Sequence, residues 1–463
     1  MQVTAPSSKC TPMPAKRDRQ ESATPLGRIL QNTAWLLGGK GFGAICGLAY
    51  LAIQTRTLGL KDFGHFALIF GTAQALTSIA GFQSWRVAVR YGSEHVHNKD
   101  WGKFGRLAML CGMIDAVGAV IGCVFAAIVI FGFAHVLDLN PKYVDVAFWY
   151  CCISLWALVS APTGVVRALN RFDMAVYVEA IVPSGRLVAA LIIWATGPSV
   201  GRFLAAWAAV DILEAVLYWY MARRLSPESI RLSNFGKWRQ ALAENPGVAR
   251  FFFITYGGSS IDAAMKNGPL LVVGGWVGTR AAGLYRLASQ LSQALSKLST
   301  LLTRSVYAEV ARVRVASKAE EFRKLAVQTT MIAGVAGLAV VAVAVLAGEQ
   351  LLAMIGGEAF ESGAGILVPL AIASSFDLAS VAFEPVLHST GKARHSLVAR
   401  LIAVVALGFG LWRFIPIGPS GAAWAVALAG AVSYLVMGLM AWRTLRQVEA
   451  GKIAIGVEDD PLE

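Results

Sequence analysis

The chain carries an internal repeat within a very apolar sequence. Residues 55–70 align without a gap with residues 274–289, at a constant offset of 219 residues. The aligned pairs include Gly59 with Gly278, Gly64 with Gly283, and Phe66 with Tyr285. Membrane transporters are often built from two copies of one helical unit, with a binding site between them. We therefore expect two related halves that face each other around a cavity.

Composition indicates a membrane protein. Of the 463 residues, 56% are hydrophobic and 15% are charged, against roughly 25% charged residues in soluble domains. Twelve segments are apolar over the length that a bilayer requires: 32–54, 63–84, 105–134, 144–166, 174–196, 202–222, 250–276, 282–303, 325–347, 364–386, 397–415 and 420–442. We predict an all-α membrane protein with twelve transmembrane helices in two pseudo-symmetric six-helix lobes.

The distribution of Lys and Arg predicts the orientation. Of 41 such residues, 30 fall in the two tails and one set of alternate loops, six fall in the other set, and five fall inside the segments. Positive charge accumulates on the cytoplasmic side of membrane proteins, so we expect both termini in the cytoplasm. The same bias accounts for most of the net charge of +13 without a nucleic-acid partner.

The predicted domain organisation follows from these segments. We expect a basic, disordered tail over residues 1–27 and an acidic cytoplasmic tail over 447–463. The N-lobe covers 28–223 and the C-lobe 250–446, joined by a cytoplasmic loop over 224–249. An even number of segments per lobe gives both lobes the same orientation, so the repeat is of the parallel kind.

Segment 282–303 carries a polar stripe. Its polar side chains recur every three or four residues and therefore lie on one helical face; they are Arg286, Gln290, Gln293, Lys297, Thr300 and Arg304. Charges facing hydrocarbon are costly, so this face must contact other helices or water. A buried polar seam between helices is one interpretation. We favour the wall of a water-filled, cationic cavity.

Further charges lie inside other segments. Asp262 and Lys266 are four residues apart and can pair along one helix. In one interpretation, the pair only neutralises the charge of Lys266. In the other, it is a charge switch: an anion that binds Lys266 frees Asp262 to take up a proton or cation. Lys40 either reaches the headgroups or faces the cavity. Arg186 lies near the predicted midplane. The candidate carboxylates Asp115, Asp211 and Glu214, with Asp377 and Glu384 as a similar pair, either neutralise the cations or bind a proton or sodium ion.

Several chemistries are unsupported by the sequence. Gly38–Gly43 is not a nucleotide-binding loop, because no Ser or Thr follows Lys40 and no strand precedes the segment. The six cysteines have no metal-ligand spacing, so we expect neither a metal nor a cofactor. We find no long loop with clustered catalytic side chains and therefore do not expect an enzyme.

Four motifs resemble the polysaccharide-transporter (Wzx-like) branch of the MOP flippase superfamily. They are Asn32-Thr33-x-Trp35, Arg56-x-Leu58-Gly59-x-x-x-Phe63-Gly64-x-Phe66-Ala67, Gln83-x-Trp85 and Arg90-Tyr91-Gly92. The resemblance implies a MATE-like, two-lobed flippase in the bacterial inner membrane. It implies transport of undecaprenyl-diphosphate-linked oligosaccharide by alternating access, alongside glycan polymerase or assembly proteins.

Combining the resemblance with the charges, we expect the diphosphate to be held by a cationic cavity of Lys40, Arg186, Lys266, Arg286 and Lys297, with Gln290 and Gln293 as polar lining. Phosphate is a natural partner of Lys and Arg. Candidate ion-coupling residues are Asp115, Asp211, Glu214 and Asp262. The main alternative is a multidrug or cation antiporter of the same superfamily, which requires an acidic cavity. A membrane enzyme and a passive scaffold are further alternatives.

Overall fold

In the computed structural model, the described residues are 25–133, 135–136, 138–227, 230–312, 319–389 and 392–449. The regular structure of this part of the chain is entirely helical. Its long helices are α2 (Pro25–Ala80), α4 (Trp101–Phe133), α9 (Val200–Leu225), α11 (Val248–Trp276), α12 (Thr279–Arg312), α13 (Ala319–Gly356), α16 (Ala393–Phe414) and α17 (Pro419–Glu449). The predicted terminal tails lie largely outside the described residues.

Shorter helices connect or extend the long ones. They are α3 (Trp85–His97), α5 (Val144–Trp156), α6 (Ser160–Ala168), α7 (Phe172–Glu179), α8 (Ile181–Thr196), α10 (Trp238–Glu244), α14 (Ala364–Ala379) and α15 (Phe383–Ser389). Short stretches of 3-10 helix occur at η1 (Pro141–Tyr143), η2 (Leu232–Lys237), η3 (Glu358–Gly363) and η4 (Ile415–Ile417). Because α2 contains Gly59 at φ 70° and ψ 175°, it consists of two helices that meet at a sharp bend. Glycine adopts this conformation without a steric penalty.

Eight helical stretches are long and apolar enough to cross a membrane. They are Gly41–Ala80, Trp101–Gly132, Pro141–Ala168, Met174–Thr196, Val327–Gly356, Glu358–Ala379, Arg394–Ile417 and Pro419–Gln447. The first of these covers two predicted segments, on either side of the Gly59 bend. Three other predicted segments coincide with α9, α11 and α12, which are helical but are not among the eight. Each of the three carries charged side chains within its predicted segment.

Three predicted segments are interrupted rather than continuous, and proline explains the interruptions. The segments 144–166, 174–196 and 364–386 break before α6, α8 and α15. Each of these helices has proline as its third residue: Pro162, Pro183 and Pro385. Proline fits the first helical turn, where no backbone N–H is required, but disrupts a helix interior. Pro269 and Pro369 lie within continuous helices, so proline alone does not determine a break.

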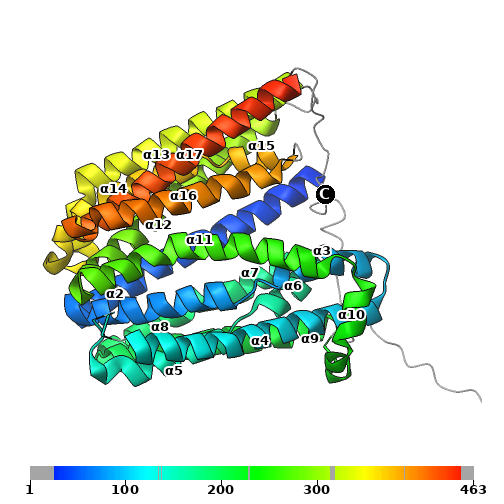
Figure 1. The fold of residues 1–463 in the computed structure, drawn as a ribbon, viewed down its shortest axis with the longest axis horizontal. Helices are drawn as coiled ribbons and strands as arrows, with labels where there is room; N and C mark the ends of the chain where they lie inside the picture. The colour runs from blue at the N-terminus through cyan, green and yellow to red at the C-terminus, as the bar shows by residue number, and fades with distance from the viewer. Residues whose placement is uncertain are drawn as a thin grey trace, which may run out of the picture.

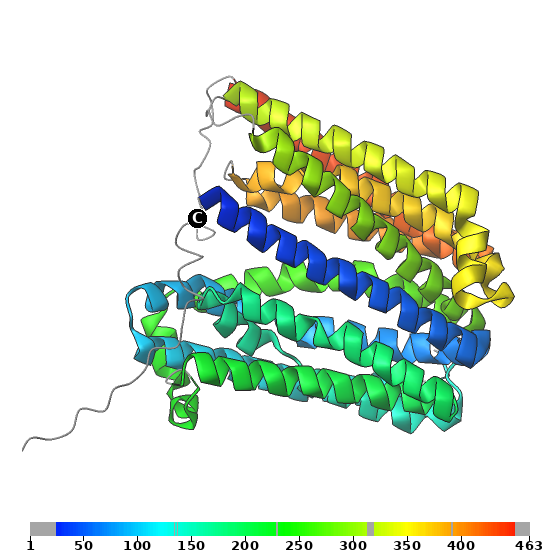
Figure 2. The same cartoon turned by 180° about the vertical axis from the view of Figure 1, so that it is seen from behind.

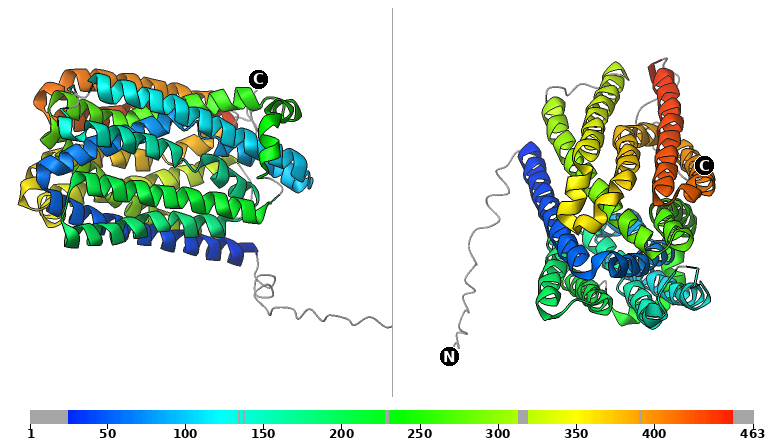
Figure 3. Two further views of the ribbon diagram at one scale, coloured as in Figure 1. Left: turned by 90° about the horizontal axis from the view of Figure 1, so that it is seen from below. Right: turned by 90° about the vertical axis from the view of Figure 1, so that its left-hand side faces the viewer.

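The helices form two groups that meet at one end. Figure 1 shows α4 to α9 on one side and α12 to α17 on the other, converging where α2 bends and diverging toward α3 and α10. The first half of α2 and the helix α11 lie between the groups, as Figures 2 and 3 also show. These two helices begin the two repeat units. Aromatic contacts join α11 to the first group of helices. The ring of Tyr256 on α11, for example, lies 5.0 Å from that of Phe82, which follows α2.

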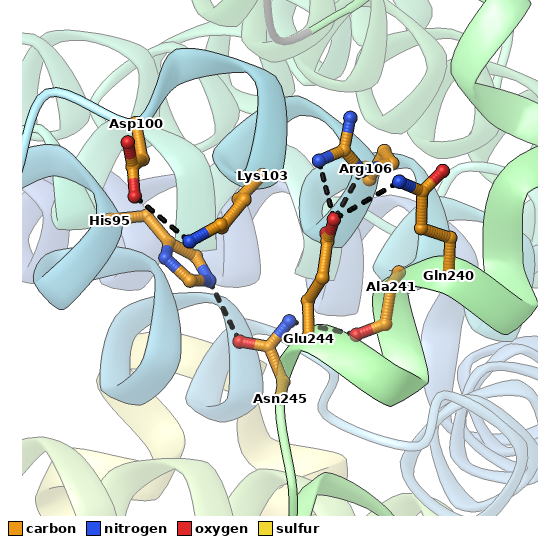
Figure 4. A network of polar contacts seen from close by, with 8 residues as sticks. All are labelled: His95, Asp100, Lys103, Arg106, Gln240, Ala241, Glu244 and Asn245. Carbon is orange, nitrogen blue, oxygen red and sulfur yellow. Dashed lines mark hydrogen bonds and ion pairs between the residues drawn. The ribbon is translucent and has the colours of Figure 1, made fainter.

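The segment that precedes α11 is bound to the first group by a polar network (Figure 4). Arg106 of α4 donates to both carboxylate oxygens of Glu244, at 2.9 and 2.6 Å. The Asn245 amide donates to the Ala241 carbonyl at 2.8 Å, which orients its side-chain oxygen toward Nε2 of His95, also at 2.8 Å. Paired Arg–carboxylate bonds are directional as well as strong, so α10 is held firmly against α4.

Candidate functional site

A cavity of about 220 Å³ lies between α2, α8, α9, α11 and α12. Its lining residues are Tyr50, Leu51, Gln54, Phe63, Phe66, Phe70, Gln74, Arg186, Trp207, Lys266, Asn267, Leu270, Tyr285, Arg286, Ser289, Gln290, Gln293 and Lys297. Four of these side chains are cationic, and the lining contains no carboxylate among the described residues. Such a cavity favours an anion over a cation.

The polar stripe of segment 282–303 faces this cavity. Arg286, Gln290, Gln293 and Lys297 all contribute to the lining, because α12 is continuous and keeps residues three or four apart on one face. The side chains of Thr300 and Arg304 lie outside the described residues. The described part of the stripe therefore forms a wall of the cavity, as the favoured interpretation expects, and not a closed seam between helices.

Arg286 has no acidic partner within the described chain. Its guanidinium lies 5.0 Å from the centre of the Phe70 ring. With the Gln290 amide oriented so that its oxygen faces Arg286, this oxygen accepts from Nε at 3.2 Å and from Nη2 at 2.8 Å. Neutral partners satisfy hydrogen bonds but leave the positive charge uncompensated. An anion in the cavity would supply the missing charge.

Arg186, on α8, lines the same cavity in a different environment. Its Nη2 donates to Oδ1 of Asp211 on α9 at 2.8 Å, and the two side chains are only 13% and 20% exposed. The guanidinium also lies 5.5 Å from the Phe70 ring and 5.6 Å from that of Trp207. Asp211 therefore neutralises Arg186, which was one of the two roles expected for this carboxylate.

The expected pairing of Asp262 with Lys266 is wrong. Asp262 Oδ2 instead accepts from Nη1 of Arg400 at 2.9 Å, and Nη2 of the same arginine donates to Glu384 at 2.7 Å. Arg400 lies on α16, inside the predicted segment 397–415. It was not among the predicted site residues, so its reach across to α11 and α15 was missed. Lys266 makes no ion pair within the described residues. Its nearest charged neighbours in electrostatic terms are Arg286 and Lys297, which are also positive and therefore repel it.

The remaining predicted acids lie away from the cavity. Asp115 is 7% exposed, and its Oδ2 accepts from the backbone N–H of Ala161 at 2.7 Å. It therefore caps the start of α6, next to the break in segment 144–166. Glu214 follows Asp211 by three residues on α9. The expected single-helix face of Asp377 and Glu384 is also wrong, because α14 ends between them at Ala379.

For Lys40, the structure describes the position of the backbone but not that of the side chain. Its backbone lies in the first half of α2, but its side chain lies outside the described residues, so its expected position in the cavity stays a prediction. Within the described residues, no cluster of three or more His, Cys, Asp or Glu side chains could hold a metal ion.

Several lining residues were not singled out from the sequence. The aromatic residues Phe66, Phe70 and Trp207 are nearly buried and form one face of the cavity, while Gln54, Gln74 and Asn267 add amide groups. A signal for the amides was available, since polar side chains inside apolar segments are rarely lipid-facing. Aromatic residues are common in every segment, so their role in the lining has no sequence signal.

Comparisons with solved structures identify the fold. The chain is similar to an inward-facing multidrug resistance MATE family transporter of the MOP superfamily, with a TM-score of 0.65 and 14% identity over 88% of this chain and 96% of that one. It is equally similar to the lipid II flippase MurJ in an inward closed conformation, with a TM-score of 0.65, 13% identity and 90% of both chains covered. The predicted MATE-like helical fold is thereby confirmed.

Sequence comparisons identify the family. The chain is 25% identical over 333 residues to the inner membrane protein YghQ of Escherichia coli K12, covering 71% of this chain and 92% of that protein. A family model described as polysaccharide biosynthesis protein matches residues 29–307, more than half of the chain. The resemblance inferred from the motifs is therefore confirmed, and the chain belongs to the polysaccharide biosynthesis protein family.

Proposed function

We propose that the protein is a flippase that moves undecaprenyl-diphosphate-linked oligosaccharide across the bacterial inner membrane during surface polysaccharide synthesis. The observation that carries the proposal is the cationic cavity without a lining carboxylate. A diphosphate offers several oxygens to Arg and Lys donors. Membership of the polysaccharide biosynthesis family supports the glycan part of the substrate.

The size of the cavity suggests that only part of the substrate, the diphosphate, lies inside it. At about 220 Å³, it is smaller than the 300–1,000 Å³ of pockets that enclose drug-sized ligands. It suits a diphosphate with adjoining atoms but not several sugars. In the proposed complex, Arg286, Lys266 and Lys297 hold the diphosphate with support from Arg186 and Lys40, and the glycan extends toward the end where the helix groups diverge.

The proposed transport cycle uses two six-helix lobes with twelve membrane spans and both termini in the cytoplasm. The lobes comprise residues 28–223 and 250–446, and the loop 224–249 joins them. Relative rocking of the lobes exposes the cavity to one side of the membrane and then to the other. The divergent end, with α3 and α10, then lies on the cytoplasmic side.

Coupling to a proton or sodium gradient is also part of the proposal. Of the four candidate carboxylates, Asp211 and Asp262 already have arginine partners, and Asp115 caps a helix. Glu214 makes no ion pair or hydrogen bond within the described residues, so it is the best-placed carboxylate to bind an external cation.

Deletion of the gene tests the function. We expect a complete undecaprenyl-linked repeat unit to accumulate in the cytoplasmic leaflet, with loss of surface polysaccharide, and extraction with mass analysis would identify the glycan. Complementation with the unaltered gene is the control. Unchanged surface polysaccharide would refute the proposal. Normal glycan combined with new sensitivity to cationic drugs would instead favour the antiporter, which the MATE-like fold permits but the carboxylate-free lining disfavours.

A further inference from the structure

The convergent end of the molecule is closed by close packing between the two repeat units. A Cβ atom at Gly283 would lie 3.0 Å from the Leu60 carbonyl oxygen and 3.2 Å from Cα of Gly64. A Cβ at Gly64 would overlap the carbonyl oxygen of Thr279. Gly64 and Gly283 are aligned partners in the repeat, so the two copies touch at equivalent positions, where only glycine permits such an approach.

Two contacts then join one half to the other at this end, one from the end of helix α13 and one from the loop that contains Asp138. In the first crossing, Thr55 Oγ1 and an Arg56 nitrogen donate to the backbone carbonyls of Ile355 and Met354. In the second crossing, Asp138 reaches the start of α12. Met354 and Ile355, at the end of α13, and Asp138, in its loop, occupy corresponding places in the two repeat units, each following the third predicted span of its half.

The second crossing differs because it uses a side-chain carboxylate. Asp138 Oδ2 accepts from the backbone N–H of Thr279 at 3.1 Å and from the Thr279 hydroxyl at 2.6 Å, with the Asp138 carbonyl oxygen 2.9 Å from the same hydroxyl. Thr279 is the first residue of α12. Asp138 therefore caps a helix of the other half, 141 residues away, where the N-terminal N–H groups favour a negative charge.

An aromatic layer lies between this contact and the cavity. Phe63 and Phe66 are nearly fully buried, and Phe63 packs on Phe360 across the two halves, with ring centres 5.8 Å apart. Phe66 packs on Trp207 at 6.0 Å. Phe63 and Phe66 also line the cavity. Because the contact of Phe63 with Phe360 joins the two halves, opening this end would have to separate these two rings.

We propose that the Asp138–Thr279 contact is a latch that holds the extracytoplasmic end of the transporter closed and must break before the cavity opens outward. This inference rests on the proposed alternating-access function and on the proposed orientation. Unlike the first crossing, it joins a charged acceptor to both a backbone and a side-chain donor of the opposite half. Its loss should therefore shift the balance between inward-open and outward-open states.

Thiol accessibility tests the latch without any substrate. A reporter cysteine is introduced as Ser289→Cys, since Ser289 lines the cavity, in a chain whose six native cysteines are replaced by serine. A membrane-impermeant maleimide is applied to intact spheroplasts and, separately, to inverted vesicles. Asp138→Ala should raise the labelling rate from the outside by about tenfold, the size expected for losing charge-assisted hydrogen bonds, and lower it from the inside.

Matched variants separate the latch from general loosening. Thr279→Val should raise outside labelling by a smaller factor, since its backbone N–H still donates to Asp138. Asp138→Asn should also show a smaller rise, since an amide oxygen still accepts. Asp145→Asn is the control, because Asp145 is exposed near the same end. Unchanged outside labelling in Asp138→Ala would overturn the proposal, as would an equal rise in the control or a rise on the inside alone. Failure of glycan transport in the unaltered chain would refute the proposed function but would not alter these rates.

Discussion

The two arginines that contact Phe70 face the same cavity but have different electrostatic surroundings. Arg186, in the first half, is paired with Asp211 at 2.8 Å. Arg286, in the second half, has Gln290 and an aromatic ring as neighbours and no carboxylate partner within the described residues. A buried charge pair is largely self-sufficient, whereas a buried charge with only neutral partners remains costly. If the proposed function is correct, the second half supplies the main charge for the substrate, and the first half supplies a neutralised arginine that only supports it.

Removing the unpaired charge should have the largest effect. We expect Arg286→Ala to lower the flipping rate on the order of a hundredfold, since losing a buried, charged partner costs 2–5 kcal/mol. Arg286→Lys should retain part of the activity because it keeps the charge without the planar fork. Arg280→Ala, an exposed residue of the same helix, is the control. Flipping is measured with labelled lipid-linked glycan in vesicles, and equal rates for Arg286→Ala and Arg280→Ala would remove the basis of the comparison.

Lys297 should contribute less than Arg286. Its side chain is exposed, and an exposed cation interacts more weakly because solvent screens it. We expect Lys297→Ala to reduce flipping by about tenfold, the equivalent of roughly 1.4 kcal/mol, at unchanged expression. Unaltered transport would exclude Lys297 from the substrate contacts.

The paired charges can be removed together. Replacing a buried ion pair by apolar residues of similar size is often neutral for stability, whereas removing one partner costs about 3–5 kcal/mol. We therefore expect Asp211→Leu alone to lower the thermal midpoint strongly and Arg186→Met with Asp211→Leu to restore it, with flipping within about threefold of the unaltered protein. Thermal unfolding in detergent and vesicle transport check both points. If the double variant loses transport as fully as Arg286→Ala, Arg186 contributes to substrate binding as much as Arg286 does and is not merely a supporting residue.

Acid should not loosen the closed end. The hydroxyl and backbone N–H of Thr279 hold the pKa of Asp138 below its ordinary value, and the charges of His65 and Lys61 act in the same direction. A lowered pKa means that the contact is fully present above the ordinary carboxyl pKa of about 3.9 and is lost only as the pH falls through the lowered value. Outside labelling of Ser289→Cys, divided by the labelling rate of a free thiol at the same pH because maleimide reacts with the thiolate, should therefore not rise between about pH 8 and pH 5. A rise within this range would contradict the assignment of Asp138.

Periodicity predicted most of the site, because charges on one helix share a face whatever their neighbours are. Arg286, Gln290, Gln293 and Lys297 could thus be placed together from their spacing alone. For Arg186, the sequence offered Asp211 as only one of several neutralising acids. The partners of Asp262 and Arg400 could not be placed, since their triad joins different helices and depends on how those helices pack. Pairing along one helix was the wrong model for Asp262, because the guanidinium of Arg400 reaches it from α16.

For the fold, the sequence likewise predicted the helices but not the places where some of them are interrupted. Apolar length and the repeat predicted the helices and the two related halves, and the motif resemblance implied the likeness to a MOP-type protein. The breaks before α6 and α15 were missed. The apolar runs continue through these breaks, so hydropathy carries no trace of them. The prolines at the third position of each new helix were the available signal, but Pro269 and Pro369 show that the same residue also occurs in unbroken helices.

The small volume of the cavity has a consequence for how such a system changes over time. In the proposed complex, the enclosed groups recognise the diphosphate anchor, which every undecaprenyl-linked glycan shares, and the sugars lie outside the 220 Å³ enclosure. A cell that acquires new glycosyltransferases could then export a new surface polymer with the transporter it already has. Selection for antigenic variety would act on the enzymes that build the glycan, while the transporter's binding residues stay the same.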